Sequence, residues 1–166
     1  MQNFIPYCTV TGITVWEFPY GEDESYPACV SLKLALSEKL LELCHNGVTE
    51  FFTNCEYGVS LWVAEALVAM RETLNAPVKV HIIIPHEEQA VKWNSAVRER
   101  YYDVHAAADT VTMLSTQYHE DCYADADHYM LDNSVMLLTV GDNAPLADYA
   151  KSKEKRTEEI KLPILL

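Results

Sequence analysis

The segment VKVHIII, residues 78–84, is the strongest indication of the fold. Its apolar β-branched side chains occupy both alternating faces, and such a run predicts a strand buried on both sides, as in a parallel sheet. Apolar side chains recur at helical spacing in residues 60–74 before this segment and in residues 87–107 after it. A buried strand between two helices predicts parallel strands joined by right-handed helical crossovers.

The same alternation of strand and helix patterns extends over the whole chain. We expect further strands in residues 4–11, 49–53, 110–114, 134–140 and 160–166, and further helices in residues 30–44, 123–131 and 145–155. Pro163 would place the last strand at a sheet edge, because proline cannot donate to a neighbouring strand. The sequence therefore predicts an α/β fold, a three-layer Rossmann-like open sheet, mostly parallel, with helices on both faces. Its 166 residues fit a single domain, residues 1–166.

The charge of the chain excludes one broad class of partner. Lys and Arg together number 12 and Asp and Glu together number 25, so the formal net charge is −13. An acidic surface repels the phosphate backbone of nucleic acids, so we expect no general nucleic-acid binding. Backbone N–H groups could still hold a single phosphate of a small nucleotide.

The cysteines and the first residues of the chain indicate a compartment. Five cysteines, with no CxxC pair among them, favour free thiols in a reducing cytoplasm over a disulfide framework or a zinc site. The first residues, MQNFIPYCTVTG, lack the basic and apolar regions of a signal peptide, and no apolar run is long enough to cross a bilayer. We therefore expect a cytoplasmic protein with no membrane partner.

Three of the five glycines, Gly12, Gly58 and Gly141, lie just after expected strands. Open α/β sheets bind ligands at the carboxyl ends of their strands, and glycine lets the backbone approach a phosphate closely. The alternative is that these glycines only form turns. Ser60 begins the next expected helix, where it either marks an anion site at the helix N-terminus or serves only as an N-cap.

The region after the third expected strand, PHEEQAVKW, places Gln89 and Trp93 four residues apart. On one helical face, an amide beside an indole would suit a nucleobase or a sugar, and core packing of Trp93 is the alternative. The stretch QYHEDCYADADHYMLD, residues 117–132, is rich in metal-ligand side chains but has no ligand spacing. We interpret it as a solvated acidic loop and helix, and expect neither a metal nor a cofactor.

Four segments carry a resemblance to a known family. They are VTG (residues 10–12), FFTNCEYGVSLWVAE (51–65), Pro85-x-x-x-Gln89-x-x-x-Trp93, and HYMLDNS (128–134). In this order and spacing the chain resembles the YpsA-like family of the SLOG superfamily, Rossmann-like domains related to DprA and to the LOG phosphoribohydrolases. The resemblance covers about residues 10–150 and implies a nucleotide or nucleotide derivative as ligand in the strand-end cleft.

The chain departs from the family pattern at positions that would contact phosphate. Ile13 and Thr14 stand where the family usually has His-Arg, and Ala126 and Asp127 stand where it has Arg-Asn. The Gly-Gly-Thr loop after the fifth strand is replaced by GDNAPLADYA, residues 141–150. The chain has therefore lost two cationic positions and its second phosphate loop.

Three functions remain open. The leading hypothesis is a nucleotide-binding domain without robust catalysis. The first alternative is a protein-interaction or regulatory module that kept the fold and lost the ligand site. The second is a nucleoside or nucleotide N-glycosidase, like the LOG phosphoribohydrolases, with Glu65, Asp142 or Asp148 as the catalytic carboxylate.

The candidate ligand-binding residues follow from the strand ends and the resemblance. They are Thr11, Gly12, Asn54, Cys55, Glu56, Gly58, Val59, Ser60, Glu65, Pro85, Gln89, Trp93, Asp132, Gly141, Asp142 and Asn143. We expect a bound anion near the backbone of Gly12 and residues 56–60, and we expect Gly58→Val to remove binding while leaving the fold intact. The ten tyrosines and the resemblance to dimeric domains also lead us to expect a homodimer.

Overall fold

The computed structural model describes residues 7–162 and contains a six-stranded sheet. The strands are β1 (Tyr7–Gly12), β2 (Glu50–Thr53), β3 (Lys79–Ile84), β4 (Thr110–Met113), β5 (Met136–Val140) and β6 (Arg156–Ile160). They lie in the order β4-β3-β2-β1-β5-β6, and every neighbouring pair is parallel. The predicted α/β fold with an open sheet is confirmed, and the sheet is parallel throughout its described strands.

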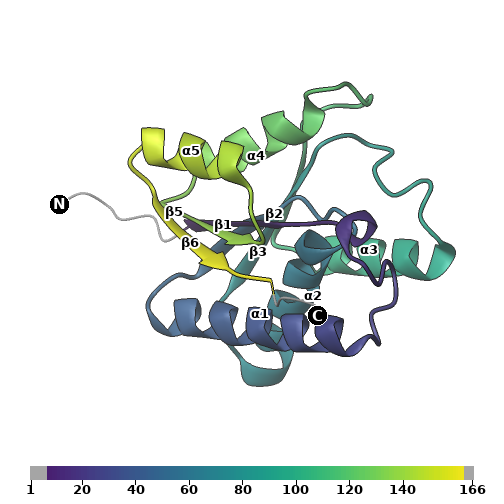
Figure 1. The fold of residues 1–166 in the computed structure, drawn as a ribbon, viewed down its shortest axis with the longest axis horizontal. Helices are drawn as coiled ribbons and strands as arrows, with labels where there is room; N and C mark the ends of the chain where they lie inside the picture. The colour runs from purple at the N-terminus through teal and green to yellow at the C-terminus, as the bar shows by residue number, and fades with distance from the viewer. Residues whose placement is uncertain (1–6, 163–166) are drawn as a thin grey trace.

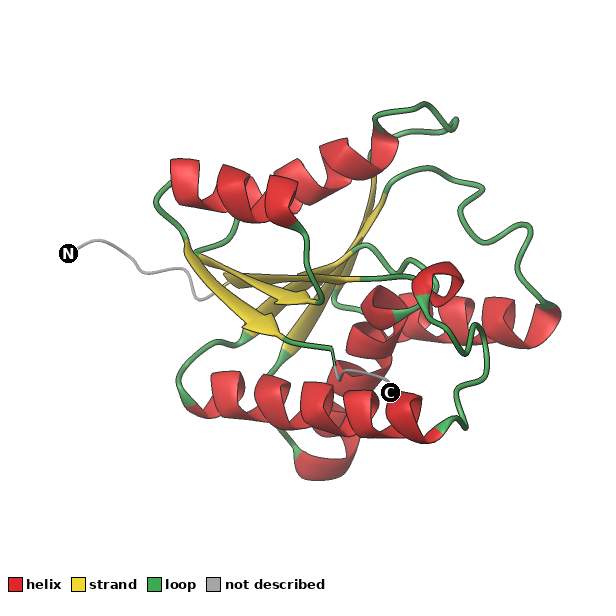
Figure 2. Cartoon of the chain, viewed as in Figure 1, coloured by secondary structure: helices red, strands yellow, loops and turns green. Residues whose placement is uncertain are grey.

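Helices cover both faces of this sheet (Figures 1 and 2). They are α1 (Pro27–His45), α2 (Val59–Leu74), α3 (Ser95–Ala107), α4 (Cys122–Asp132) and α5 (Ala144–Ser152), with a short 3-10 helix, η1 (Val15–Glu17). The first three lie on one side of the sheet, and α4 and α5 lie on the other. The chain after β1 therefore leaves towards one face and the chain after β5 towards the other, which opens a crevice between two adjacent strand ends.

Alternating side chains of the strands build a core on each face. In β2, Phe51 belongs to the large core under α1 and α2, while the next residue, Phe52, belongs to the cluster under α4. All five residues of β5 are buried, as expected for a strand covered on both sides. The core side chains of α4 include Ala126 and Met130, which lie one helical turn apart.

The helix predicted over residues 87–107 begins later than expected. α3 begins at Ser95, where the Asn94 side chain accepts a hydrogen bond from the Val97 N–H (3.0 Å), and the residues before it form turns. Gln89 and Trp93 therefore do not share a helical face, and that part of the prediction is wrong. An N-cap asparagine competes effectively with helix continuation because it satisfies a backbone N–H that the first turn leaves free.

The last predicted strand is also displaced. β6 spans Arg156–Ile160 rather than residues 160–166, and α5 ends at Ser152 rather than near residue 155. The β6 sequence, RTEEI, is charged and lacks strand periodicity, which an edge strand tolerates because solvent reaches it. The edge position is as expected, while Pro163 and residues 4–6 of the first predicted strand lie outside the described residues.

Two further expectations concern the cysteines and membrane-spanning helices. All five cysteines are buried free thiols. Within residues 7–162, no helix is long and apolar enough to cross a membrane.

Candidate functional site

A polar cleft of about 340 Å³ opens where β1, β2 and β5 end. This is the switch point of the sheet, where open α/β folds bind their ligands. The predicted residues that line the cleft are Thr11, Gly12, Asn54, Glu56, Ser60, Asp142 and Asn143. The remaining lining residues are Ile13, Thr14, Glu17, Asp127, Thr139 and Val140.

Two residues that line this cleft each carry a buried polar atom with no hydrogen-bond partner among residues 7–162. These atoms are the Oγ1 of Thr11, whose residue is 5% exposed, and one carboxylate oxygen, Oδ1, of Asp127. A buried polar group without a partner costs about 1–3 kcal/mol, so such groups are rare in folded proteins, and a bound water, an ion or a functional role accounts for them. The hollows lined by Trp62 and by Glu158 have one such residue each, whereas this cleft has two.

The cleft is acidic. Glu17, Glu56, Asp127 and Asp142 line it, and none of its described lining residues is Lys, Arg or His. Burial raises the pKa of Glu56 to about 7, with the charges of Asp127 and Glu17 adding to the shift, and burial also raises the pKa of Asp127 to about 7. Near neutral pH each of these two carboxyl groups is therefore divided between a protonated form, which donates a hydrogen bond, and an ionised form, which only accepts.

The loop after β2 holds Glu56 in place through its own side chains. The Glu56 N–H donates to the Asn54 side-chain oxygen (2.9 Å), and the Cys55 N–H donates to the Thr53 hydroxyl (3.2 Å). The Thr53 hydroxyl donates in turn to the Ser60 carbonyl (2.7 Å). Cys55 has a positive φ of 57°, which a non-glycine residue adopts only when its surroundings fix it.

A sequence profile described as "YspA SLOG family", for YpsA, matches residues 8–163 of the chain. The chain belongs to the YpsA SLOG family. The recognised resemblance is confirmed, and the match covers nearly every residue of the sheet described above.

The YpsA-family chain is also similar to UPF0398 proteins of several bacteria. It is 30% identical to one from Halalkalibacterium halodurans, over 54% of this chain and 47% of the relative. It is 29% identical to one from Macrococcus caseolyticus over 75% and 68%, and 27% identical to one from Staphylococcus aureus over 80% and 71%. The match thus spans about half the length of the first of these relatives.

The family segment from Pro85 to Trp93 packs against the loop after β2 and does not line the cleft. Gln89 is buried, and its side-chain N–H donates to the Asn54 carbonyl (3.0 Å) while its side-chain oxygen accepts from the Tyr101 hydroxyl (3.0 Å). Trp93 packs against Tyr57 and Tyr101, with ring centroids 5.5 and 5.3 Å apart. Neither Gln89 nor Trp93 lines the cleft, and neither does the buried Pro85. In this YpsA-family chain, Gln89 and Trp93 position the loop that carries Glu56.

The glycines of the strand ends serve close packing between the loop after β1 and the start of α2. A Cβ at Gly12 would overlap the Val59 side chain, and a Cβ at Gly58 would lie 2.7 Å from both the Ile13 carbonyl oxygen and the Thr14 Cα. Gly58 also has a φ of 140°. The expectation that Gly58→Val leaves the fold intact is therefore wrong, because the added side chain meets backbone and not only a ligand.

Several other predicted residues also lie outside the cleft. Cys55 and Val59 are fully buried in the core, and Gly141 lies against Leu162 and Ile13. Asp132, at the C-terminal end of α4, accepts a hydrogen bond from the Tyr149 hydroxyl (2.7 Å). Asp148 lies in an adjoining hollow of about 290 Å³ between α5 and β6, which also includes Asp142.

Glu65 is engaged in an ion-pair network away from the cleft. Arg100 of α3 contacts Glu65 of α2 (2.7 Å) and Glu24 of the loop before α1 (2.6 Å). Lys33 contacts the same Glu24 carboxylate. Of the three carboxylates proposed for catalysis, only Asp142 therefore lines the cleft, and Asp127 is a lining acid that was not among the candidates.

Replacing Arg100 tests whether Glu65 has a structural role. We expect Arg100→Met to lower the free energy of unfolding by about 1–2 kcal/mol, because both glutamates lose their shared partner in a half-buried site. Arg98→Met is the matched control, since Arg98 lies on the same helix and contacts only the Val91 carbonyl (3.3 Å). Equal losses for the two variants in urea denaturation would contradict the structural role.

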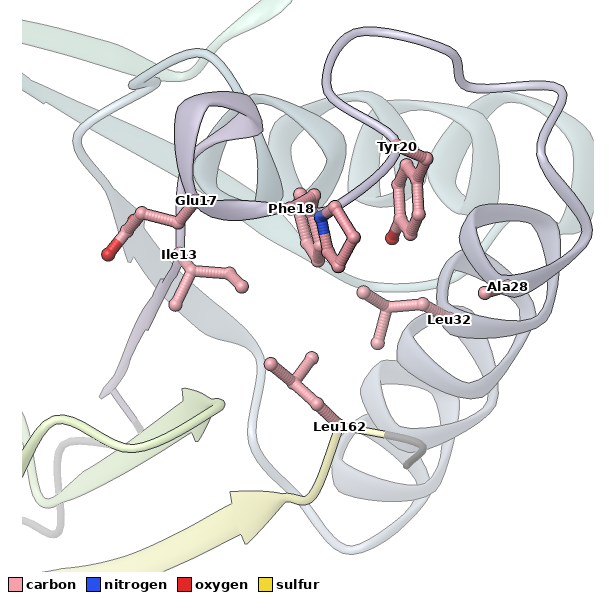
Figure 3. Close-up of a pocket in the computed structure, with 8 residues that line it drawn as sticks. Ile13, Glu17, Phe18, Tyr20, Ala28, Leu32 and Leu162 are labelled. Carbon is pink, nitrogen blue, oxygen red and sulfur yellow. The ribbon is translucent and has the colours of Figure 1, made fainter. Parts of the chain in front are cut away.

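An apolar pocket of about 220 Å³ adjoins the cleft and shares Ile13 and Glu17 with it. Figure 3 shows the side chains of Phe18, Leu32 and Leu162 facing its interior, while the Glu17 carboxylate points away from them. A polar cleft and an apolar pocket thus lie on either side of one short segment, residues 13–17. In residues 7–162, no group of three or more His, Cys, Asp or Glu side chains is arranged to hold a metal ion.

Proposed function

We propose that this chain binds a small molecule derived from a nucleoside or nucleotide in the strand-end cleft, without robust turnover. The observation that carries the proposal is the pair of buried, unpartnered polar atoms, Thr11 Oγ1 and Asp127 Oδ1, on residues that line one cleft at the switch point of the sheet. Membership of the YpsA SLOG family supports a nucleotide-like ligand.

The shapes of the two neighbouring hollows support a ligand with two different halves. The cleft of about 340 Å³ is lined mostly by polar side chains, and the adjoining pocket of about 220 Å³ is lined mostly by apolar ones. A nucleoside has a sugar with several hydroxyl groups and a flat base with apolar faces. Their combined size is in the range of small-molecule sites, about 300–1,000 Å³.

The lost phosphate contacts support binding without robust turnover. Ala126, at the family's Arg position, is fully buried in the core under α4, and the Asn143 side chain caps α5 by accepting from the Leu146 N–H (3.3 Å). A charge-assisted hydrogen bond to a phosphate contributes about 1.5–3 kcal/mol of positioning. Without such a hydrogen bond, the phosphate would not orient the sugar correctly relative to a catalytic carboxylate.

The acidic groups of the cleft favour one second candidate, an N-glycosidase. Cleaving a base from ribose builds positive charge on the sugar, which a carboxylate stabilises, and an acid or base with a pKa near the operating pH transfers protons efficiently. Glu56 and Asp127 have these properties, with pKa values raised to about 7 by burial. Release of free base from nucleosides or nucleoside monophosphates, lost in Asp127→Asn, would favour this candidate over binding alone.

Removing the Thr11 hydroxyl tests the proposed binding site. We expect Thr11→Val to weaken binding of the best ligand among the common nucleosides and nucleotides by about tenfold, because one buried hydrogen bond is lost. The measurement is isothermal titration calorimetry of the unmodified protein and the variant. Thr112→Val, on the edge strand β4 and outside the cleft, is the control and should bind as the unmodified protein does.

Two outcomes would contradict the proposal. Equal affinity of Thr11→Val and the unmodified protein would exclude this cleft as the site. A complete lack of binding across the nucleosides and nucleotides would exclude the ligand class and would favour the alternative of a protein-interaction module.

A further inference from the structure

We propose that the part of the ligand held in the cleft carries no negative charge, and that Glu56 and Asp127 accept hydrogen bonds from its hydroxyl or amino groups. The cleft would then select an unphosphorylated nucleoside over the corresponding nucleotide. This inference rests on the proposed function, because it names the chemical class of the ligand at that same site.

The charge around the cleft supports exclusion of phosphate. Its four carboxylates, from Glu17, Glu56, Asp127 and Asp142, come from four separate parts of the chain and face one space. Among the described lining residues there is no cation to offset them, and the whole chain has a formal net charge of −13. Field lines concentrate in a cleft with low-dielectric walls, so a phosphate entering here would be repelled by local and overall charge together.

Three backbone N–H groups at or just before the start of α2 already have partners within the protein. The Val59 N–H donates to the Ile13 carbonyl (3.2 Å), and the Leu61 N–H donates to the Glu56 carbonyl (3.1 Å). The Glu56 N–H itself donates to the Asn54 side chain (2.9 Å). A helix N-terminus attracts anions through N–H groups that lack partners, so these three groups add little to that attraction here.

The side chains that do face the cleft match a ligand that offers hydrogen-bond donors. Carboxylate oxygens accept from hydroxyl pairs, and an acidic side chain holds the ribose hydroxyls in many Rossmann-type sites. Asp127 lines the cleft with a carboxyl group, and Thr11 lines it with a hydroxyl that can both donate and accept. Burial keeps Glu56 and Asp127 partly protonated near neutral pH, which lowers their mutual repulsion and supplies a donor as well.

The experiment compares each common ribonucleoside with its 5′-monophosphate by calorimetry at low ionic strength, with EDTA and, separately, with Mg²⁺. We expect at least one nucleoside to bind about tenfold or more tightly than its monophosphate. In the double variant Glu56→Gln/Asp127→Asn that preference should fall several-fold, because two of the four carboxyl groups that line the cleft no longer ionise. Asp103→Asn, an exposed carboxylate on α3, is the matched control and should leave the preference unchanged.

A second measurement needs no variant. The unmodified protein is titrated at salt concentrations of about 20 mM and about 300 mM. The ratio of its affinities for the nucleoside and the monophosphate should be smaller at the higher concentration, because ions screen the repulsion of the phosphate. A preference that salt leaves unchanged would contradict the electrostatic argument.

The outcomes separate this inference from the proposed function. Binding of a monophosphate as tightly as its nucleoside, with EDTA or only with Mg²⁺, overturns the inference and leaves the proposed function standing. Binding of neither class overturns the proposed function and this inference with it. A 2′-deoxynucleoside that binds as well as the ribonucleoside would exclude the 2′-hydroxyl as the donor, while the other hydroxyls or a base amino group would still fulfil the inference.

Discussion

Gly58→Ala should lower the free energy of unfolding by about 3 kcal/mol or more, the largest effect we expect from one methyl group in this protein. The new Cβ would lie 2.7 Å from the Ile13 carbonyl oxygen and 2.7 Å from the Thr14 Cα, and both are backbone atoms that no side-chain rotation can move away. The φ of 140° adds strain for any residue with a Cβ. Urea denaturation of the unmodified and variant proteins measures the loss.

Two other glycines separate the contribution of the clash from that of the backbone conformation. Gly21 and Gly47 also have positive φ values, 57° and 94°, but a Cβ at either would meet no atom within 4 Å. Gly21→Ala and Gly47→Ala should therefore cost only about 1 kcal/mol each, the penalty of the left-handed conformation alone. If Gly58→Ala costs no more than these two, the loop after β1 does not pack against the start of α2 as tightly as the structure indicates.

Much of the fold could be predicted because the hydrophobic pattern depends directly on burial. The run VKVHIII predicts a strand covered on both faces, and β3 lies there with helices of both layers around it. The pattern failed where local chemistry overrides it. The Asn94 cap sets the start of α3, and the charged segment RTEEI forms a strand only because β5 offers it a free edge.

The location of the candidate site in the fold could be predicted more reliably than the residues that line it. Parallel strands end at one side of the sheet, so the residues after β1, β2 and β5 meet there whatever their identity. Asp127 was named as a departure from the family pattern but not as a candidate, because only the rotation of α4, with Ala126 and Met130 packed into the core, brings it to the cleft. Glu65 was misassigned because its partner, Arg100, is 35 residues away on another helix.

Asp127→Asn should make the protein more stable at about pH 8 by about 2 kcal/mol. Burial raises the pKa of Asp127 from 3.8 to about 7 in the folded state, so between these values the folded protein keeps a proton that the unfolded chain has released. Stability therefore falls as the pH rises through this window and stays low above it. A shift of this size corresponds to roughly 4 kcal/mol at most, and structural relaxation around a partly accessible carboxylate reduces it.

The pH profile distinguishes this effect from a general change in packing. Asparagine has nearly the shape of aspartate but does not ionise, so the variant should match the unmodified protein near pH 4 and exceed it increasingly towards pH 7. Part of the pH dependence should remain, because burial also raises the pKa of Glu56 to about 7. Asp103→Asn, which removes an exposed carboxylate from α3, should leave the profile unchanged. Parallel profiles for Asp127→Asn and the unmodified protein would mean that Asp127 ionises over the same pH range in the folded and the unfolded chain, and this result would contradict the burial of its carboxyl group.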